Sequence, residues 1–291
     1  MIPWGLALLG FGAIGWGWYS ARRMLHPQPR AFPAPDPFPA YKIVSLLGHD
    51  DLPFEVWVLE APHPRGVIVA CHGYGGSRLQ LIGIAQVLRQ RSYTVMVWDF
   101  PGHGTRRGPC TFGIHETRDV DAIVSWRNEQ PELASLPLGA FGLSMGGAIA
   151  CQTAARNPAV RGLVLDSTYA NLYPIVARAI SARYHVPVVP WAWLTWAGVQ
   201  LALGRHLSKL DPAILARRLT QPLLLIHGQQ DSTVPPDHAR TILAGWRGPT
   251  ESWIEPRAAH VGAYALDPRG YGDRLAAFLD RWLTASQPLS S

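Results

Sequence analysis

The stretch Gly139-Ala140-Phe141-Gly142-Leu143-Ser144-Met145-Gly146-Gly147-Ala148 decides how this chain folds. It holds a G-x-S-x-G motif with Ser144 at the centre, after a short apolar run (138–141) and before a helical pattern (147–156). The apolar run can form a buried strand, so the motif lies between a strand and a helix. A G-x-S-x-G motif in this context is typical of a sharp turn that presents a serine nucleophile.

The two glycines of the motif are what such a turn requires. A serine hydroxyl is a useful nucleophile only when it projects freely and a base can take its proton. Gly142 and Gly146 have no side chains that would collide across the turn. The helix that begins behind Ser144 also points free N–H groups toward any negative charge that develops there. The alternative is a small-residue helix start without catalysis, because a motif match alone is a hypothesis.

Outward from the motif, apolar runs alternate with helical patterns. We expect strands at residues 66–71, 93–100, 138–141, 160–165, 222–226 and 250–255, after a hairpin of 41–47 and 54–60. We expect helices at residues 79–90, 116–128, 147–156, 236–246 and 271–284. This alternation predicts an α/β fold, in which a mostly parallel central sheet has helices on both faces.

Polar motifs follow the predicted strands. They are His72-Gly73-Tyr74-Gly75-Gly76-Ser77, Asp99-Phe100-Pro101-Gly102-His103-Gly104, Asp166-Ser167-Thr168, His227-Gly228-Gln229-Gln230-Asp231 and the loop that contains His260. In open α/β sheets, ligands bind at the carboxyl ends of the strands. The active site is therefore expected at that edge of the sheet.

A serine nucleophile needs a base, and eleven histidines are available. His260 follows the last strand in a loop of small residues, which lets its imidazole reach a neighbouring strand end. For this residue taken alone, a surface histidine is the alternative. His72, His103 and His227 end strands beside glycines, and we expect them to shape loops through hydrogen bonds to the backbone.

The base in turn needs a carboxylate that orients it. Asp231 follows the apolar run 223–226 and can meet a histidine from the loop of the next strand. Asp166, which ends the preceding strand, is the rival acid, although it could equally cap a helix or hydrogen-bond within its own loop. Asp99 also ends a strand, but it precedes the nucleophile in the chain.

The chain order Ser144, Asp231, His260 is the order expected of α/β-hydrolases. Residues 40–287 resemble that superfamily. The motifs at His72, Asp99, Ser144 and His227 are similar to those of the serine aminopeptidase/monoacylglycerol-lipase-like groups and of the membrane-associated ABHD (α/β-hydrolase domain) groups. These groups include hydrolases of acyl esters and acyl thioesters.

The resemblance assigns a role to each candidate residue. It implies that Ser144 is the nucleophile, His260 the base and Asp231 the orienting acid. The backbone N–H groups of Tyr74 and Met145 would form the oxyanion hole, where each donor is worth on the order of 3 kcal/mol in the transition state. This chemistry needs neither a cofactor nor a metal ion, so none is expected.

The resemblance also implies an α/β-hydrolase domain at residues 41–287, with a small helical cap inserted at about 169–215. The insertion contains the apolar run 186–203. Pro187 and Pro190 shorten its helix to about 13 residues, too few to cross a bilayer. We expect a cap helix over the active site, with either an acyl-chain tunnel or shallow membrane contact. A buried helix that binds nothing is the alternative.

The N-terminus is apolar over residues 2–19, which at about 1.5 Å per residue reach roughly 27 Å as a helix. Arg22 and Arg23 follow the run and, by the positive-inside rule, stay in the cytoplasm. We therefore expect residues 1–24 to be a single-pass membrane anchor, with the catalytic domain on the cytoplasmic side, followed by a proline-rich linker at 25–40. A cleavable signal peptide and a helix docked on the core are the alternatives.

The composition excludes other classes of function. The 291 residues carry a net charge of +6, mostly from scattered arginines, and the only lysines are Lys42 and Lys209, so no nucleic-acid-binding arm is present. The three cysteines, Cys71, Cys110 and Cys151, show no C-x-x-C spacing, so neither a metal site nor a disulfide framework is expected. The oligomeric state stays open.

These features favour a cofactor-free serine hydrolase that cleaves carboxylic ester or thioester bonds of a hydrophobic, lipid-like acyl substrate. A peptidase or amidase, or a perhydrolase, would use the same three residues. A peptidase that binds free amino termini would need acidic residues in the cap, and only Asp211 lies between Asp166 and Asp231. A non-catalytic, membrane-tethered binding module on the same fold is the remaining alternative.

Overall fold

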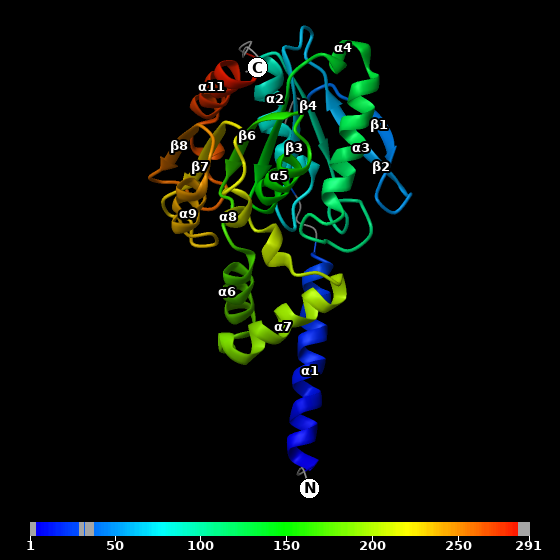
Figure 1. Ribbon diagram of the computed structural model, residues 1–291, viewed down its shortest axis with the longest axis vertical. Helices are drawn as coiled ribbons and strands as arrows, with labels where there is room; N and C mark the ends of the chain where they lie inside the picture. Colours follow the sequence, from blue (N-terminus) through cyan, green and yellow to red (C-terminus); the bar gives the residue numbers. More distant parts are fainter. Residues whose placement is uncertain (1–3, 29–31, 33–37, 285–291) are drawn as a thin grey trace.

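The computed structural model describes residues 4–28, 32 and 38–284, with side chains from residue 12 onward. Parts of the predicted anchor (1–3), of the predicted linker (29–31 and 33–37) and of the predicted hydrolase domain (285–287) lie outside the described residues. The described part has a central sheet between helices, and a group of helices that projects from one end of it (Figure 1).

One sheet holds eight strands, which are β1 (Lys42–Leu47), β2 (Pro53–Leu59), β3 (Gly66–Cys71), β4 (Tyr93–Trp98), β5 (Leu138–Leu143), β6 (Val160–Asp166), β7 (Leu223–Gly228) and β8 (Thr250–Glu255). Their order is β1-β2-β4-β3-β5-β6-β7-β8. Only β2 pairs antiparallel, with β1 and β4, and all other neighbours are parallel. Every residue of β3, β4, β5 and β7 is buried, as a parallel sheet covered on both faces requires.

The helices beside the sheet are α2 (Ile82–Gln90), α3 (Glu116–Glu129), α4 (Pro131–Ala134), α5 (Met145–Arg156), α8 (Pro212–Leu215), α9 (Asp237–Gly245), α10 (Ala263–Leu266) and α11 (Pro268–Leu279). Short helical turns add η1 (Arg78–Leu81), η2 (Leu207–Leu210) and η3 (Asp280–Thr284). α3 and α5 pack on one face of the sheet, and α2 and α11 pack on the other.

The sheet has a hydrophobic core on each face, and successive residues of a strand point alternately into the two cores. In β3, Val67 and Val69 lie in the core under α3 and α5, whereas Ile68 lies in the core under α2 and α11. The predicted α/β class, with a mostly parallel sheet and helices on both faces, is confirmed. β5 extends two residues past the predicted run 138–141, because Gly142 and Leu143 continue to pair with β6.

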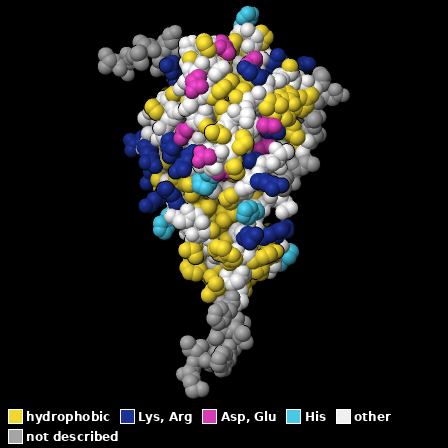
Figure 2. Space-filling model, turned by 90° about the vertical axis from the view of Figure 1, so that its right-hand side faces the viewer, with side chains coloured by type: hydrophobic (Ala, Val, Ile, Leu, Met, Phe, Trp, Pro, Cys, Tyr) yellow, Lys and Arg dark blue, Asp and Glu magenta, His cyan; other side chains and the backbone are white. Residues whose placement is uncertain are grey.

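A helical cap connects β6 to β7. Its helices α6 (Leu172–Tyr184) and α7 (Val188–Leu203) lead away from the sheet, and α1 (Trp4–Leu25) projects from the same end of the molecule (Figure 1). Val189 has a non-helical backbone, so the regular part of α7 begins at Pro190. Hydrophobic side chains gather over this end of the molecule (Figure 2).

The N-terminal helix packs closely against the cap. A Cβ atom on Gly198 of α7 would lie 2.8 Å from the Gly17 carbonyl oxygen of α1. The Ser20 hydroxyl lies 2.7 Å from the Thr195 hydroxyl, within hydrogen-bond distance. Ala21 is buried in the same core as the cap. The second half of α1 therefore matches the alternative of a helix docked on the core.

The predicted transmembrane span is not supported. Among the described residues, no single helix combines the length and the apolar character needed to cross a membrane. The helices α6 and α7 together are long and apolar enough, but the chain bends by 118° between them. The cytoplasmic side assigned to the catalytic domain stays a prediction.

Candidate active site

Ser144 lies at the turn between β5 and α5. Its backbone has φ 52° and ψ −116°, a conformation that residues other than glycine rarely adopt. The Ser144 N–H donates to the Asp166 carbonyl oxygen at 2.8 Å, which holds the turn against β6. A Cβ atom on Gly142 would lie 2.3 Å from the Gly146 backbone, and one on Gly146 would lie 2.1 Å from the Cys71 carbonyl oxygen. The close approach of the backbones therefore requires glycine at both elbow positions.

Three of the predicted side chains meet at this turn. His260, in the loop after β8, places Nε2 3.0 Å from Ser144 Oγ and Nδ1 2.7 Å from Asp231 Oδ2. The Asp231 carboxylate is buried, whereas the His260 side chain is 23% exposed. In this arrangement an imidazole can take the serine proton while a carboxylate holds the imidazole in place.

Backbone hydrogen bonds join the loops that carry the acid and the base. The Gln229 N–H donates to the Glu255 carbonyl oxygen at 2.9 Å. The Gln230 N–H donates to the Ala258 carbonyl oxygen, also at 2.9 Å. Asp231 comes directly after Gln230 in the first loop, and His260 comes shortly after Ala258 in the second. The parallel pairing of β7 with β8 therefore brings the carboxylate and the imidazole together.

The three histidines predicted to shape loops do so. Each places one ring nitrogen 2.8–2.9 Å from a backbone carbonyl oxygen, and the pairs are His72 with Gly73, His103 with Pro101 and His227 with Val234. Burial lowers the pKa of all three imidazoles, which favours the neutral form. They support the loops around the site and leave His260 as the partner of the serine.

Asp166, the rival acid, has other partners. Tyr271 Oη donates to its Oδ2 and Ser167 Oγ to its Oδ1, both at 2.9 Å. Ser167 Oγ accepts from the Val261 N–H at 3.0 Å, so this network supports the loop of His260 from behind. Sequence reasoning did not assign this role to Ser167, although Ser167 lies in one of the polar motifs, and it missed Tyr271. No motif marks Tyr271, which comes from α11, far along the chain.

The buried Asp166 carboxyl predicts a pH effect on stability. Burial, partly offset by hydrogen bonds from Ser167 and Tyr271, raises the pKa of Asp166 from 3.8 to about 6. The folded state thus holds this proton more tightly than the unfolded state, so stability from this group falls as the pH rises from about 4 to about 6. Relative to Asp166→Asn, the wild type should lose about 2 kcal/mol of unfolding free energy over that range. Urea unfolding at both pH values measures the difference, and a pH-independent difference would contradict the assignment.

The N–H groups predicted for the oxyanion hole come from the loop after β3 and from the start of α5. Met145 is the first residue of α5, and the first N–H groups of a helix have no partner within it. A Cβ atom on Gly73 would lie 3.6 Å from Ser144 Cβ, so the loop that contains Tyr74 lies beside the serine. Gln80 Oε1 accepts from the Gly73 N–H at 2.9 Å and holds this loop, a contact that no sequence pattern indicated.

The N-terminal helix also reaches the walls of the site. Tyr74 Oη donates to the Met24 carbonyl oxygen at 2.8 Å, and the Cys110 N–H donates to the Leu25 carbonyl oxygen at 2.7 Å. Cys110 Sγ in turn lies 3.6 Å from Met145 Sδ. The end of α1 is thus part of the structure around both predicted oxyanion residues.

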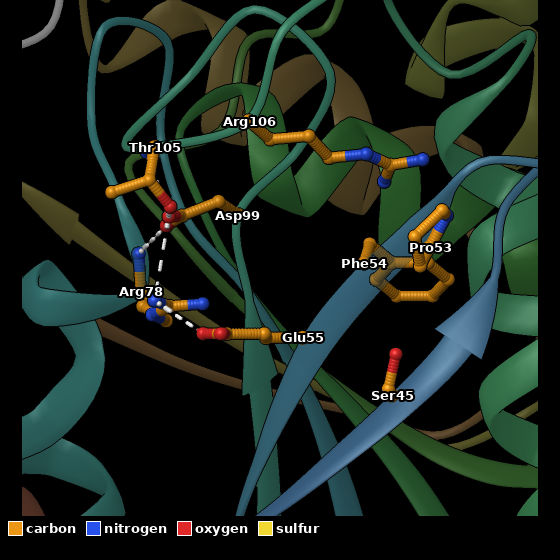
Figure 3. A pocket seen from close by; sticks show the side chains of 8 residues that line it. All are labelled: Ser45, Pro53, Phe54, Glu55, Arg78, Asp99, Thr105 and Arg106. Carbon is orange, nitrogen blue, oxygen red and sulfur yellow. Dashed lines mark hydrogen bonds and ion pairs between the residues drawn. The ribbon is translucent and has the colours of Figure 1, made fainter.

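A separate cavity of about 320 Å³ opens between the β1–β2 hairpin and the loops after β3 and β4 (Figure 3). Its lining residues are Ser45, Pro53, Phe54, Glu55, Arg78, Asp99, Thr105 and Arg106. Asp99 accepts from the backbone N–H groups of Arg78 (2.7 Å) and Thr105 (3.0 Å), and Arg78 also pairs with Glu55 at 3.0 Å. None of the three predicted catalytic residues lines this cavity. Its paired charged side chains hold the loops after β3 and β4 in place.

The described residues offer no obvious site for a metal ion. No group of three or more His, Cys, Asp or Glu side chains in this part of the chain is arranged to hold one. The three cysteines are free and buried, and burial is the main cause that raises the pKa of each thiol. All three lie in the hydrophobic core.

Known proteins are similar to this chain in sequence and in fold. Residues 62–200 match the sequence profile of the serine aminopeptidase family, S33. The α/β-hydrolase domain-containing protein WAV2 of Arabidopsis thaliana is 23% identical over 257 residues, which cover 83% of this chain and 79% of that protein. The chain belongs to the α/β-hydrolase superfamily. The predicted resemblance is confirmed at that level.

An esterase and a lipase are also similar to this α/β-hydrolase. The esterase Pf2001 of Pyrococcus furiosus has the same fold, with a TM-score of 0.73 and 24% identity over 89% of this chain and 98% of that chain. The phosphatidylserine lipase ABHD16A of Rattus norvegicus is 24% identical over 180 residues, which cover 60% of this chain and 30% of that protein.

Proposed function

We propose that this α/β-hydrolase is a serine hydrolase that cleaves the carboxylic ester or thioester bond of a hydrophobic acyl substrate. One observation carries the proposal: hydrogen bonds of 3.0 and 2.7 Å run from Ser144 Oγ through His260 to Asp231. Ser144 lies at a strained turn between a strand and a helix, which is the environment that activates a serine in hydrolases of this fold.

The reaction proceeds through an acyl-enzyme. Ser144 Oγ bonds to the carbonyl carbon of the substrate while its proton passes to His260 Nε2. The N–H groups of Tyr74 and Met145 stabilise the resulting oxyanion. The C–O or C–S bond then breaks, and His260 gives the proton to the leaving alcohol or thiol. Water, deprotonated by His260, attacks the acyl-enzyme and releases the carboxylic acid.

The cap supports an apolar acyl group as the substrate. α7 contains no charged residue, and its large side chains are aliphatic or aromatic. The only acid in the cap, Asp211, is buried, and its Oδ1 accepts from the Leu172 N–H at 3.0 Å. It is thus occupied in holding the start of α6 rather than placed to bind an ammonium group. One relative is named a phosphatidylserine lipase, which agrees with a lipid-like substrate.

A peptidase is the second candidate, because the profile that matches residues 62–200 is that of a serine aminopeptidase family. It would need to recognise an amino terminus, and the buried Asp211 makes this the weaker candidate. Both candidates share the same three catalytic residues, so they differ in substrate and not in mechanism.

Labelling and hydrolysis by the full-length protein test the proposal. A fluorophosphonate probe should label the wild type and abolish its hydrolysis of p-nitrophenyl esters and acyl thioesters. kcat/KM should rise with acyl chain length and exceed that for aminoacyl p-nitroanilides. Faster turnover of the anilides would favour the peptidase. A folded protein that is neither labelled nor active would indicate a binding module instead.

A further inference from the structure

The projecting helices expose large hydrophobic side chains to solvent. We call this surface the apolar tip, and its exposed residues are Ile14 (67%), Trp18 (55%), Tyr19 (54%), Val189 (72%), Trp193 (60%) and Leu201 (77%). Figure 2 shows hydrophobic side chains concentrated at the lower end of the described surface. Single exposed hydrophobic residues are normal on a protein surface, but a concentration of this kind marks an interaction site.

The apolar tip is a packed structure and not a loose terminus. The Trp16 ring of α1 makes edge contacts with Tyr184 of α6 and Trp191 of α7, with ring centroids 4.7 and 5.4 Å apart. Trp16 thus fills the space between the three helices. The side chains on the outer sides of α1 and α7 remain exposed although the inner sides are packed, so the exposure belongs to the folded state.

The charged residues of α1, α6 and α7 indicate which kind of partner the apolar tip binds. α1, α6 and α7 contain no acidic residue, and their basic residues are Arg22, Arg23, Arg178 and Arg183, all exposed. Among the described residues, none of these four arginines forms an ion pair with a carboxylate. The three helices therefore present four positive charges beside an apolar surface. Tryptophan and tyrosine with neighbouring arginines are the residues that favour the interface between lipid headgroups and acyl chains.

We propose that the apolar tip docks on the surface of an anionic lipid bilayer and lies in its headgroup region without crossing it. A second copy of the chain fits less well, because a symmetric contact would bring the four arginines of one copy, which form no ion pair among the described residues, against those of the other. A bilayer with anionic headgroups instead offers negative charge above an apolar interior, which matches the arginines and the tip.

Docking in this way orients the active site. α6 leaves the sheet at the carboxyl end of β6, and the end of α1 contacts the loop after β3 through the hydrogen bond from Tyr74 Oη to Met24. The tip therefore belongs to the same edge of the sheet as Ser144. A docked molecule has this edge toward the bilayer, where hydrophobic acyl groups are concentrated.

Vesicle sedimentation of the purified full-length protein tests the proposal. The wild type should bind vesicles of phosphatidylcholine mixed with phosphatidylglycerol, and bind vesicles of phosphatidylcholine alone more weakly. The double change Trp193→Glu and Leu201→Glu should weaken binding at least about tenfold, because it places charge in the apolar contact. Arg22→Gln and Arg23→Gln should each weaken binding to the anionic vesicles about fivefold, and added salt should reduce that difference.

Leu52→Glu is the matched control, since Leu52 is 60% exposed but precedes β2, outside the tip. It should bind vesicles as the wild type does. All variants should keep the thermal unfolding of the wild type, and the arginine variants and Leu52→Glu should also keep its short-chain ester hydrolysis, so vesicle binding is judged separately from catalysis. Wild-type binding by the Trp193→Glu/Leu201→Glu protein would overturn the proposal. The proposal would also be overturned if a tip variant changed only the oligomeric state. That result would identify a second copy of the chain as the partner.

Discussion

Ser144→Ala should abolish hydrolysis and leave the fold intact. The change removes the one atom that bonds to the acyl carbon, so kcat/KM should fall by a factor on the order of 10⁴ to 10⁶. Alanine keeps the Cβ atom and loses only the hydroxyl that lies 3.0 Å from His260 Nε2, so the unfolding free energy should change by about 1 kcal/mol or less. Initial rates with a short-chain ester and urea unfolding of the same samples measure both quantities.

The matched control is Ser232→Ala, in the exposed part of the loop after Asp231. It should retain wild-type kinetics and labelling. His260→Ala should lose about as much activity as Ser144→Ala, and combining the two changes should add little, because the residues act as one unit. If Ser144→Ala kept more than a tenth of the wild-type activity, another residue would have to supply the nucleophile.

The sheet and the serine turn could be predicted because their signals are local. The six residues of β3 are apolar and all are buried, so composition alone marks a strand covered on both faces. Gly142 and Gly146 leave no room for a Cβ atom, so the turn restricts which residues occupy it. His260 and Asp231 could be paired from the sequence because consecutive parallel strands place their following loops together.

The contacts that support the site could not be predicted in the same way. Tyr271 Oη donates to the Asp166 carboxylate, and the Gly73 backbone N–H donates to Gln80 Oε1, and no motif or periodicity marks Tyr271 or Gln80. Such contacts depend on how α11 and η1 pack on the sheet. Any polar residue at those positions looks like a surface residue in the sequence.

The N-terminal helix shows a second limit. Apolar composition over residues 2–19 is compatible with a membrane span and with a helix packed on protein, because both exclude charge. The observed packing depends on small residues, Gly17 and Ser20, that face matching small residues of α7. The residues of α7 that they contact lie far along the chain, and a hydropathy pattern does not show which distant residues pack together.

Asp231→Asn should lower kcat/KM by a factor on the order of 10⁴ although it changes only one atom of the side chain. In the wild type, Asp231 Oδ1 accepts from the N–H groups of Thr233 (2.9 Å) and Val234 (2.8 Å), and Oδ2 accepts from His260 Nδ1 (2.7 Å). In asparagine the oxygen must remain at the Oδ1 position, because only an acceptor suits the two backbone donors. The amide NH₂ group then faces His260.

That orientation reverses the imidazole tautomer. The new amide donates to His260 Nδ1, so the ring proton moves to Nε2, which then points a hydrogen at Ser144 and cannot accept its proton. The rates of hydrolysis and of fluorophosphonate labelling should therefore fall together, while urea unfolding changes little. Asp237→Asn, at a carboxylate that is 83% exposed on α9, should keep full activity. If Asp166→Asn lost as much activity and Asp231→Asn did not, the rival carboxylate would be the one that orients the base.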